Sequence, residues 1–224
     1  MKDAKTYWNE VYSEKPHSDG KAPSEFLVQM LPRLQKGKVL DIGMGEGANA
    51  VYLAQKGFHV KGFDISDVAI EHAQKLAKDT GVEIDAKRAD LDLFIMGLME
   101  YESIVMMNFK PPVTRYYSEL IRALKQGGTL LVESYAIAEM EEAIGKEEAY
   151  RNYFYNSNEL LKNLAGLRIL FYQEAIVNGK HRVQCIAKKP LDKDAAKYKL
   201  FDMQTNEKHV KSKHLELAEK FFKD

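Results

Sequence analysis

The chain has 224 residues, of which 45% are hydrophobic and 29% are charged, and this balance excludes disordered, collagen-like and disulfide-stapled proteins. Lysine plus arginine number 33, as do aspartate plus glutamate, so no net charge favours nucleic acid or an anionic membrane. Cys185 is the lone cysteine. Because we find neither a leader peptide nor an apolar run of about 18 residues, we expect a cytoplasmic protein.

Strands and helices alternate in the first half of the chain. Buried apolar runs predict the strands, and apolar residues at helical spacing predict the helices. Ser66 is placed to cap a helix, and Gly57 and Gly81 are placed to end one. The expected elements are, in order, a strand at 38–42, a helix at 48–56, a strand at 58–63, a helix at 66–80 and a strand at 82–88.

The alternation continues in the second half and then changes. We expect a strand at 103–107, a helix at 117–124 that breaks at Gly127-Gly128, a strand at 129–133, a helix at 156–164, and strands at 167–177 and 181–188. The last two strands are separated only by Asn178-Gly179-Lys180, a connection typical of antiparallel neighbours. Parallel strands need longer crossovers. The pattern therefore predicts a Rossmann-like α/β three-layer sandwich with a seven-stranded, mostly parallel sheet and one antiparallel strand.

A glycine loop follows the first predicted strand. Asp41-Ile42-Gly43-Met44-Gly45-Glu46-Gly47 lies where a strand turns into a helix, so bare backbone and free N–H groups can approach a ligand closely. Gly43, Gly45 and Ala48 also fit the spacing used for dinucleotide pyrophosphates. Against that reading, the negative charge of Asp41 repels a pyrophosphate and suits a ligand ammonium.

Two further acids close predicted strands. Asp64 ends the second strand, where an open α/β sheet places a carboxylate beside ribose hydroxyls, and Asp90 ends the third strand in the same way. A purely structural interpretation stays open: Asp41 orders its own loop, while Asp64 and Asp90 are turn residues at strand ends.

These residues carry a resemblance. Val39 to Gly47, Asp64, Ala89-Asp90-Leu91 and the Asn178-Gly179 hairpin resemble a class I S-adenosylmethionine-dependent methyltransferase. The opening Thr6-Tyr7-Trp8-Asn9-Glu10-Val11-Tyr12 narrows the resemblance to the small-molecule group that is similar to the tellurite-resistance protein TehB and to thiopurine methyltransferases. It covers about residues 5 to 189. We therefore expect a methyltransferase domain at 1–190, whose residues 1–37 form a helical cap over the cofactor, and a helical extension at 191–224.

The resemblance implies a role for each residue of a cofactor site. Gly43, Gly45 and Gly47 would line the methionine moiety of S-adenosylmethionine and Asp41 would lie near its ammonium. On the nucleoside, Asp64 would hold both ribose hydroxyls, Ile65 would pack on adenine, Asp90 would accept from the adenine amino group, and the backbone of Leu91 would meet the ring edge. Asn108 would sit beside the sulfonium, and the aromatic residues Trp8 and Tyr12 would cover the cofactor.

The chain departs from the resemblance after the fourth predicted strand. Asn108-Phe109-Lys110-Pro111-Pro112 lacks the contiguous Asn-Pro-Pro-Tyr of amino-methylating nucleic-acid enzymes, which argues against base methylation. We assign no catalytic residue and no metal site, and we take His17, His59 and His72 as surface or helix-face residues. An aromatic cluster at 150–155 is either a substrate lid or a patch that packs the following helix.

The resemblance implies methyl transfer to a small-molecule acceptor such as a thiol or a selenium or tellurium oxyanion, with S-adenosylhomocysteine as product. Two alternatives stay open: a non-catalytic domain that binds S-adenosylmethionine and regulates a partner, and an NAD-dependent oxidoreductase, which the terminal hairpin and Asp41 disfavour. We expect no nucleic-acid or membrane partner, and self-association as a homodimer through the extension.

Overall fold

A computed structural model describes residues 3–17, 20–143 and 148–192 of the chain. Its strands are β1 (Lys38–Ile42), β2 (His59–Asp64), β3 (Asp85–Arg88), β4 (Tyr101–Met107), β5 (Leu124–Tyr135), β6 (Arg168–Val177) and β7 (Lys180–Lys188). Its helices are α1 (Ala4–Glu14), α2 (Glu25–Met30), α3 (Ala48–Gln55), α4 (Asp67–Thr80), α5 (Arg115–Ala123), α6 (Ile137–Ala143) and α7 (Glu159–Asn163), with short 3-10 helices at Leu31–Arg33 and Glu148–Tyr153.

The strands form one sheet in the order β3-β2-β1-β4-β5-β7-β6. All pairs from β3 to β5 are parallel, whereas β7 runs antiparallel to both β5 and β6. Asn178 and Gly179 join the last two strands with φ angles of 50° and 74°, as a two-residue type I′ turn requires. The predicted fold class is confirmed, including its single antiparallel strand.

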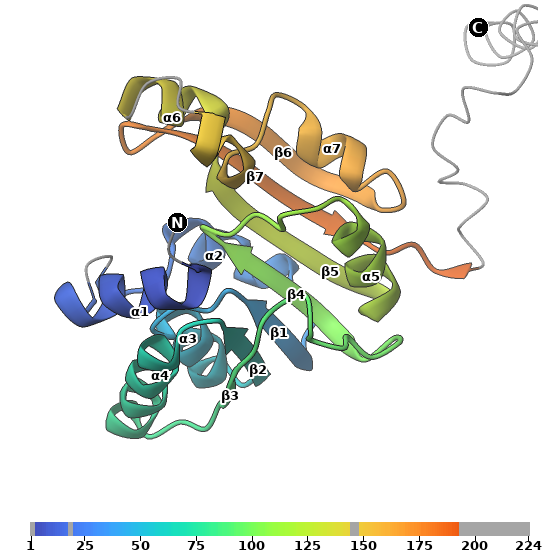
Figure 1. Cartoon of the computed structure of the whole chain (residues 1–224). Helices are drawn as coiled ribbons and strands as arrows, with labels where there is room; N and C mark the ends of the chain where they lie inside the picture. Colours follow the sequence, from blue (N-terminus) through green and yellow to red (C-terminus); the bar gives the residue numbers. More distant parts are fainter. Residues whose placement is uncertain (1–2, 18–19, 144–147, 193–224) are drawn as a thin grey trace, which may run out of the picture.

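Helices cover both faces of the sheet, which gives the predicted three layers (Figure 1). Because side chains alternate along a strand, Leu40 and Ile42 of β1 join the core under α5 and α7, while Val39 joins the core under α2, α3 and α4. The central strands β1, β4 and β5 are buried on both faces between the two cores, as is typical of parallel sheets. None of the described helices has the length and apolar character needed to cross a bilayer.

Ser66 and Gly81 bound α4 as the sequence predicts. The Ser66 hydroxyl accepts a hydrogen bond from the N–H of Ala69 at 3.1 Å, and Gly81 takes the left-handed conformation that ends the helix. The sequence predicts a strand from Val82, but the N–H of this residue donates to Ala77 in the closing turn of the helix. Strand β3 therefore begins only at Asp85.

The break between α5 and β5 also lies elsewhere than expected. The helix ends at Ala123, and β5 begins at Leu124, before the Gly127-Gly128 pair that the sequence predicts to divide them. Those glycines instead lie within β5, where a Cβ atom on Gly128 would come within 2.8 Å of the Lys125 carbonyl oxygen. The pair allows a close backbone approach inside the strand. Of the predicted extension at 191–224, all but Leu191 and Asp192 lies outside the described residues.

Candidate cofactor and acceptor site

The glycine loop connects β1 to α3 and takes backbone conformations that favour glycine. Gly43, Gly45 and Gly47 have φ angles of 65°, 52° and 84°. The absence of a side chain at Gly47 lets the start of α3 pack closely on α4, because a Cβ atom there would come within 2.7 Å of the Ala73 Cβ. The loop thus leaves β1 in a conformation that few other sequences could adopt.

Asp64 fastens the glycine loop to the end of β2. Its carboxylate accepts the N–H of Gly45 and the N–H of Ser66, each at 2.9 Å. Burial raises the pKa of Asp64, and hydrogen bonds from Ser66 and Gly45 oppose that rise. Asp64 and the glycine loop, which the sequence analysis predicted to act together, are therefore in direct contact.

Asp41, on β1, is a fully buried acidic residue of the site. Its side chain is 1% exposed, and neither carboxylate oxygen has a hydrogen-bond partner among the described residues. Burial, together with the charge of Asp64, raises the pKa of Asp41 to about 7. A buried carboxylate without a partner is costly unless something positive or hydrogen-bonding completes it.

The residues present fit a ligand with an ammonium group and a nucleoside. An ammonium would supply the partner that Asp41 lacks, and the glycines, which positive φ angles favour, add no side chains of their own to the loop. Asp64 lies at the adjacent strand end, as required to reach ribose hydroxyls. This is the donor and acceptor set that the resemblance implies for the methionine and ribose parts of S-adenosylmethionine.

The structure places two N-terminal aromatic residues by the loop. The Tyr12 hydroxyl lies 3.1 Å from the position that a Cβ atom would take on Gly45, and Trp8 stacks on Tyr12 with a ring-centroid distance of 5.7 Å. Helix α1 is held to the start of α4 by a 2.7 Å hydrogen bond from the Ser66 hydroxyl to Asn9. Tyr12 therefore lies against the glycine loop, with Trp8 stacked on it, and the cap over a bound cofactor stays a prediction.

The predicted adenine residues cluster at the ends of β2 and β3. The N–H of Ala89 donates to the Asp64 carbonyl at 2.9 Å, which brings the two strand ends together. Ile65 is half-buried, and Leu91 packs in the core. The Asp90 side chain accepts a hydrogen bond from the N–H of Asp92 at 2.9 Å. Asp90 therefore also forms the strand-end turn that the purely structural interpretation predicts. No contact here tests the adenine roles, which stay predictions.

Asn108 directly follows β4 and has its backbone in the left-handed region, at a φ of 56°. Its N–H donates to the Glu133 carbonyl at 2.7 Å, and its side-chain oxygen accepts a hydrogen bond from Arg182. The ring nearest to the glycine loop belongs to Phe109, because a Cβ atom on Gly43 would come within 2.7 Å of it. Sequence reasoning named Asn108 for this place and gave Phe109 no role.

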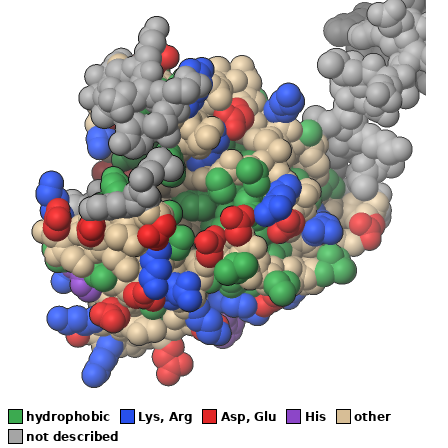
Figure 2. Space-filling view, viewed as in Figure 1, with side chains coloured by type: hydrophobic (Ala, Val, Ile, Leu, Met, Phe, Trp, Pro, Cys, Tyr) green, Lys and Arg blue, Asp and Glu red, His purple; other side chains and the backbone are tan. Residues whose placement is uncertain are grey.

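Sequence reasoning also missed Arg182. This residue lies near the start of β7, and because β7 is antiparallel its start is at the edge where β4 and β5 end. The guanidinium stacks 3.9 Å above the Tyr135 ring and donates to the Tyr135 hydroxyl at 3.2 Å and to Asn108. None of these partners among the described residues carries a negative charge. Figure 2 shows hydrophobic side chains gathered in a hollow near the end of β4, with charged side chains around it.

The aromatic cluster at 150–155 divides between packing and exposure. Tyr155 is buried in the core, with its hydroxyl 2.6 Å from the Tyr117 hydroxyl, whereas Tyr153 is exposed. The Tyr150 side chain lies outside the described residues. A cavity of about 390 Å³ opens between this segment and the chain after β4, lined by residues including Pro111, Val113, Tyr117, Arg151 and Asn156.

Residues 39–128 match a family model described as a methyltransferase domain. The match contains the glycine loop, Asp64, Asp90 and Asn108. These residues therefore match a methyltransferase domain, in agreement with the resemblance and with S-adenosylmethionine as the cofactor that it implies.

Known relatives of the methyltransferase domain act on different acceptors. A tRNA (uracil(54)-C(5))-methyltransferase of Pyrococcus abyssi is 30% identical over 102 residues, 45% of this chain and 24% of that protein. A ubiquinone biosynthesis O-methyltransferase of Pasteurella multocida is 30% identical over 97 residues, 43% of this chain and 40% of that protein. The chain thus spans less than half the length of these curated relatives.

The fold is shared with solved structures at lower identity. TehB from Haemophilus influenzae superposes with a TM-score of 0.63 at 17% identity, over 81% of this chain and 67% of that one. A methyltransferase from Clostridium acetobutylicum superposes with a TM-score of 0.62 at 14% identity, over 84% of this chain and 100% of that one. At these identities the likeness establishes the fold alone.

Proposed function

We propose that the protein transfers a methyl group from S-adenosylmethionine to a small, anionic acceptor. Arg182 carries the proposal for the acceptor class, because its cation lies at the strand-end edge without an acidic partner among the described residues. A carboxylate or an oxyanion would complete it through charge-assisted hydrogen bonds. Thiols and selenium or tellurium oxyanions that bear a negative charge belong to this class.

The proposed reaction needs little beyond correct positioning. S-adenosylmethionine supplies a methyl group that its sulfonium has already activated, so a soft anionic acceptor requires no general base. Holding two reactants in line is worth about 7–11 kcal/mol. In this chain Arg182 would orient the acceptor, the Phe109 ring and Tyr12 would exclude water, and Asp41 and Asp64 would hold the two ends of the cofactor.

The family comparisons leave the acceptor open. One relative is named for a tRNA uracil and another for ubiquinone biosynthesis, so relatedness alone favours neither a nucleic acid nor a small molecule. The net charge of zero and the interrupted Asn108-Phe109-Lys110-Pro111-Pro112 segment argue for the small molecule. The subgroup that includes TehB stays a prediction.

A panel of acceptors tests the proposal. We would incubate the full chain with S-adenosylmethionine and with thiols, selenite, tellurite, carboxylates, amines and an unmodified tRNA, and measure S-adenosylhomocysteine. Turnover with an anionic small molecule supports the proposal. Turnover only with amines or tRNA would overturn the acceptor class, and cofactor binding without any turnover would favour the non-catalytic alternative. If the chain binds a nicotinamide cofactor and does not bind S-adenosylmethionine, the oxidoreductase alternative is favoured.

A further inference from the structure

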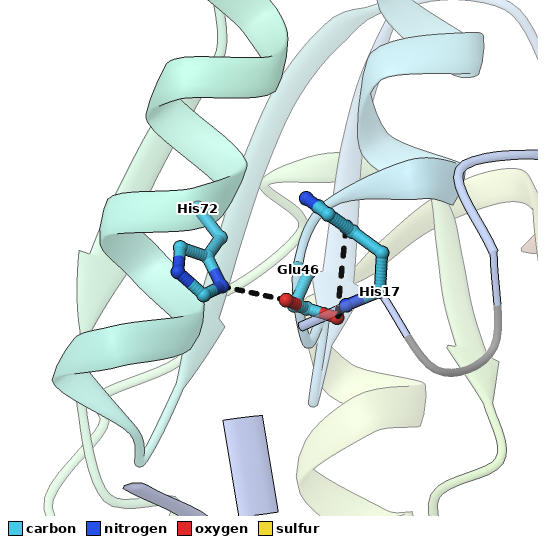
Figure 3. A group of neighbouring side chains, drawn as sticks. All are labelled: His17, Glu46 and His72. Atoms are coloured by element: carbon cyan, nitrogen blue, oxygen red, sulfur yellow. Dashed lines mark hydrogen bonds and ion pairs between the residues drawn. The ribbon is translucent and has the colours of Figure 1, made fainter. Parts of the chain in front are cut away.

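Three side chains from separate segments meet beside the glycine loop. His17 follows α1, Glu46 belongs to the loop itself, and His72 lies on α4. One ligand atom from each lies within 4.8 Å of the others. Figure 3 shows both histidines next to the Glu46 carboxylate. The His72 Nδ1 lies 2.6 Å from one carboxylate oxygen, and the His17 Nδ1 lies 3.6 Å from the other.

The cluster is sheltered from solvent. The Glu46 side chain is 10% exposed, and those of His17 and His72 are 22% and 27% exposed. The backbone N–H of His17 also donates to Glu46 at 2.7 Å, and His17 holds a φ of 53° in the left-handed region, which residues other than glycine seldom adopt. The chain after α1 is thus turned so that the imidazole of His17 faces the loop.

We propose that His17, Glu46 and His72 bind a divalent transition-metal ion, with Zn²⁺ as the ion that the set fits best. Two imidazoles and one carboxylate are ligands that zinc accepts in sites with three protein ligands, where water takes the fourth position. Hard cations such as Mg²⁺ and Ca²⁺ prefer sets made only of oxygen, so two histidines select against them.

Metal binding requires the three side chains to adjust, because one ligand atom from each lies within 4.8 Å of the others. Zinc ligands about 2.1 Å from the metal lie about 3.4 Å apart in a tetrahedron. The 3.6 Å separation of His17 and Glu46 is close to this value. The 2.6 Å separation of His72 and Glu46 is that of a hydrogen bond, and the metal replaces that bond as the two groups move apart.

The metal would tie three parts of the cofactor site together. His17 continues from the α1 cap, Glu46 lies between Gly45 and Gly47, and His72 lies on the helix that Gly47 packs against. A ligand that binds only the folded chain stabilises it in proportion to the logarithm of its concentration. Zinc would therefore raise the melting temperature and fasten the cap to the glycine loop, and neither effect needs an acceptor or turnover.

Calorimetric titration of the chelator-treated full chain with zinc chloride near pH 7.5 tests the proposal. We expect binding of one ion per chain. The affinity should fall by at least about 100-fold in His72→Ala and in Glu46→Gln, because loss of even a supporting contact costs about 10–100-fold. Glu46→Gln keeps a similar shape and hydrogen-bonding capacity, and circular dichroism without metal confirms that each variant is folded.

The matched controls are histidines outside the cluster. His59→Ala replaces an exposed residue at the start of β2, and His209→Ala with His214→Ala removes two histidines outside the described residues. These variants should bind zinc as the parent does. The proposal is overturned if the parent binds no zinc at micromolar concentration, or if the folded His72→Ala and Glu46→Gln variants keep the parent affinity. Because the readout is metal binding without cofactor or acceptor, either result is independent of the proposed methyl transfer.

Discussion

The Phe109 ring lies directly against the backbone of Gly43, so close that a Cβ atom on the glycine would be 2.7 Å from the ring. This contact joins the segment after β4 to the glycine loop after β1. It places an aromatic ring beside the proposed methionine pocket, and the preceding residue, Asn108, accepts a hydrogen bond from Arg182. Residue choice at either position therefore affects both the cofactor and the acceptor side.

Gly43→Ala should destabilise the protein and weaken cofactor binding. The alanine must adopt a φ of 65°, which costs roughly 1–2 kcal/mol for a residue with a side chain, and its methyl group meets the Phe109 ring. We expect a lower melting temperature and an S-adenosylmethionine affinity at least about tenfold weaker, a change of about 1.4 kcal/mol.

The double variant Gly43→Ala with Phe109→Ala separates the two causes. Removing the ring relieves the clash and leaves the backbone strain, so part of the stability should return relative to the sum of the single changes. Strict additivity of the two losses in denaturant unfolding would show that the ring does not press on the glycine loop.

Asp41→Asn should make the cofactor-free protein more stable at pH 8 and weaken its binding of S-adenosylmethionine. The ordinary pKa of Asp41 is 3.8 and its value in the folded protein is about 7. Between these values the unfolded chain releases a proton that the folded chain keeps. Stability therefore falls as pH rises through this window, by about 1.4 kcal/mol per pH unit for one such group.

Denaturant unfolding of the parent and Asp41→Asn at pH 4, 6 and 8 measures this slope. The variant lacks the titrating carboxyl, so its advantage over the parent should grow from pH 4 to pH 8 and then level off. A pH slope that is the same in both proteins would mean that Asp41 is already satisfied in the folded state.

Arg182→Gln should reduce acceptor turnover without changing cofactor affinity. The substitution removes the cation that the proposal assigns to the anionic acceptor, and a charged hydrogen bond is worth about 1.5–3 kcal/mol. We expect kcat/KM for the acceptor to fall by about ten- to a hundredfold, with S-adenosylmethionine affinity within about twofold of the parent. Arg168→Gln, at the exposed start of β6, is the matched control. An unchanged kcat/KM in Arg182→Gln would remove Arg182 from the acceptor side.

The sequence predicts the sheet well because its signals are local. Apolar runs, the Ser66 cap, the Gly81 end and the Asn178-Gly179 turn each report on a few adjacent residues, and the parallel order follows from the crossover lengths. The predicted end of α5 lies too late in the chain, because the N–H groups of Met99 and Glu100 donate to the carbonyls of Arg122 and Ala123. That contact depends on tertiary pairing that adjacent residues do not reveal.

The candidate site likewise contains residues whose meeting the sequence predicts and residues whose meeting it does not. Asp41, Asp64 and the glycines lie on strand ends that the sequence orders, so their meeting could be predicted. Arg182 reaches the site only because β7 inserts beside β5 in reverse. Likewise, His17 and His72 come together only after α1 packs on α4, and each appears in the sequence as an isolated histidine.

The measurement that tests the central claim most directly is calorimetric titration of S-adenosylmethionine into the parent, Asp64→Ala and the exposed-site control Asp85→Ala. Asp64 is proposed to hold the ribose and is seen to hold the glycine loop. We predict an affinity at least about tenfold weaker in folded Asp64→Ala, since each charged hydrogen bond contributes about 1.5–3 kcal/mol, and parent affinity in Asp85→Ala. Undiminished affinity in Asp64→Ala would contradict the placement of the cofactor across this edge of the sheet.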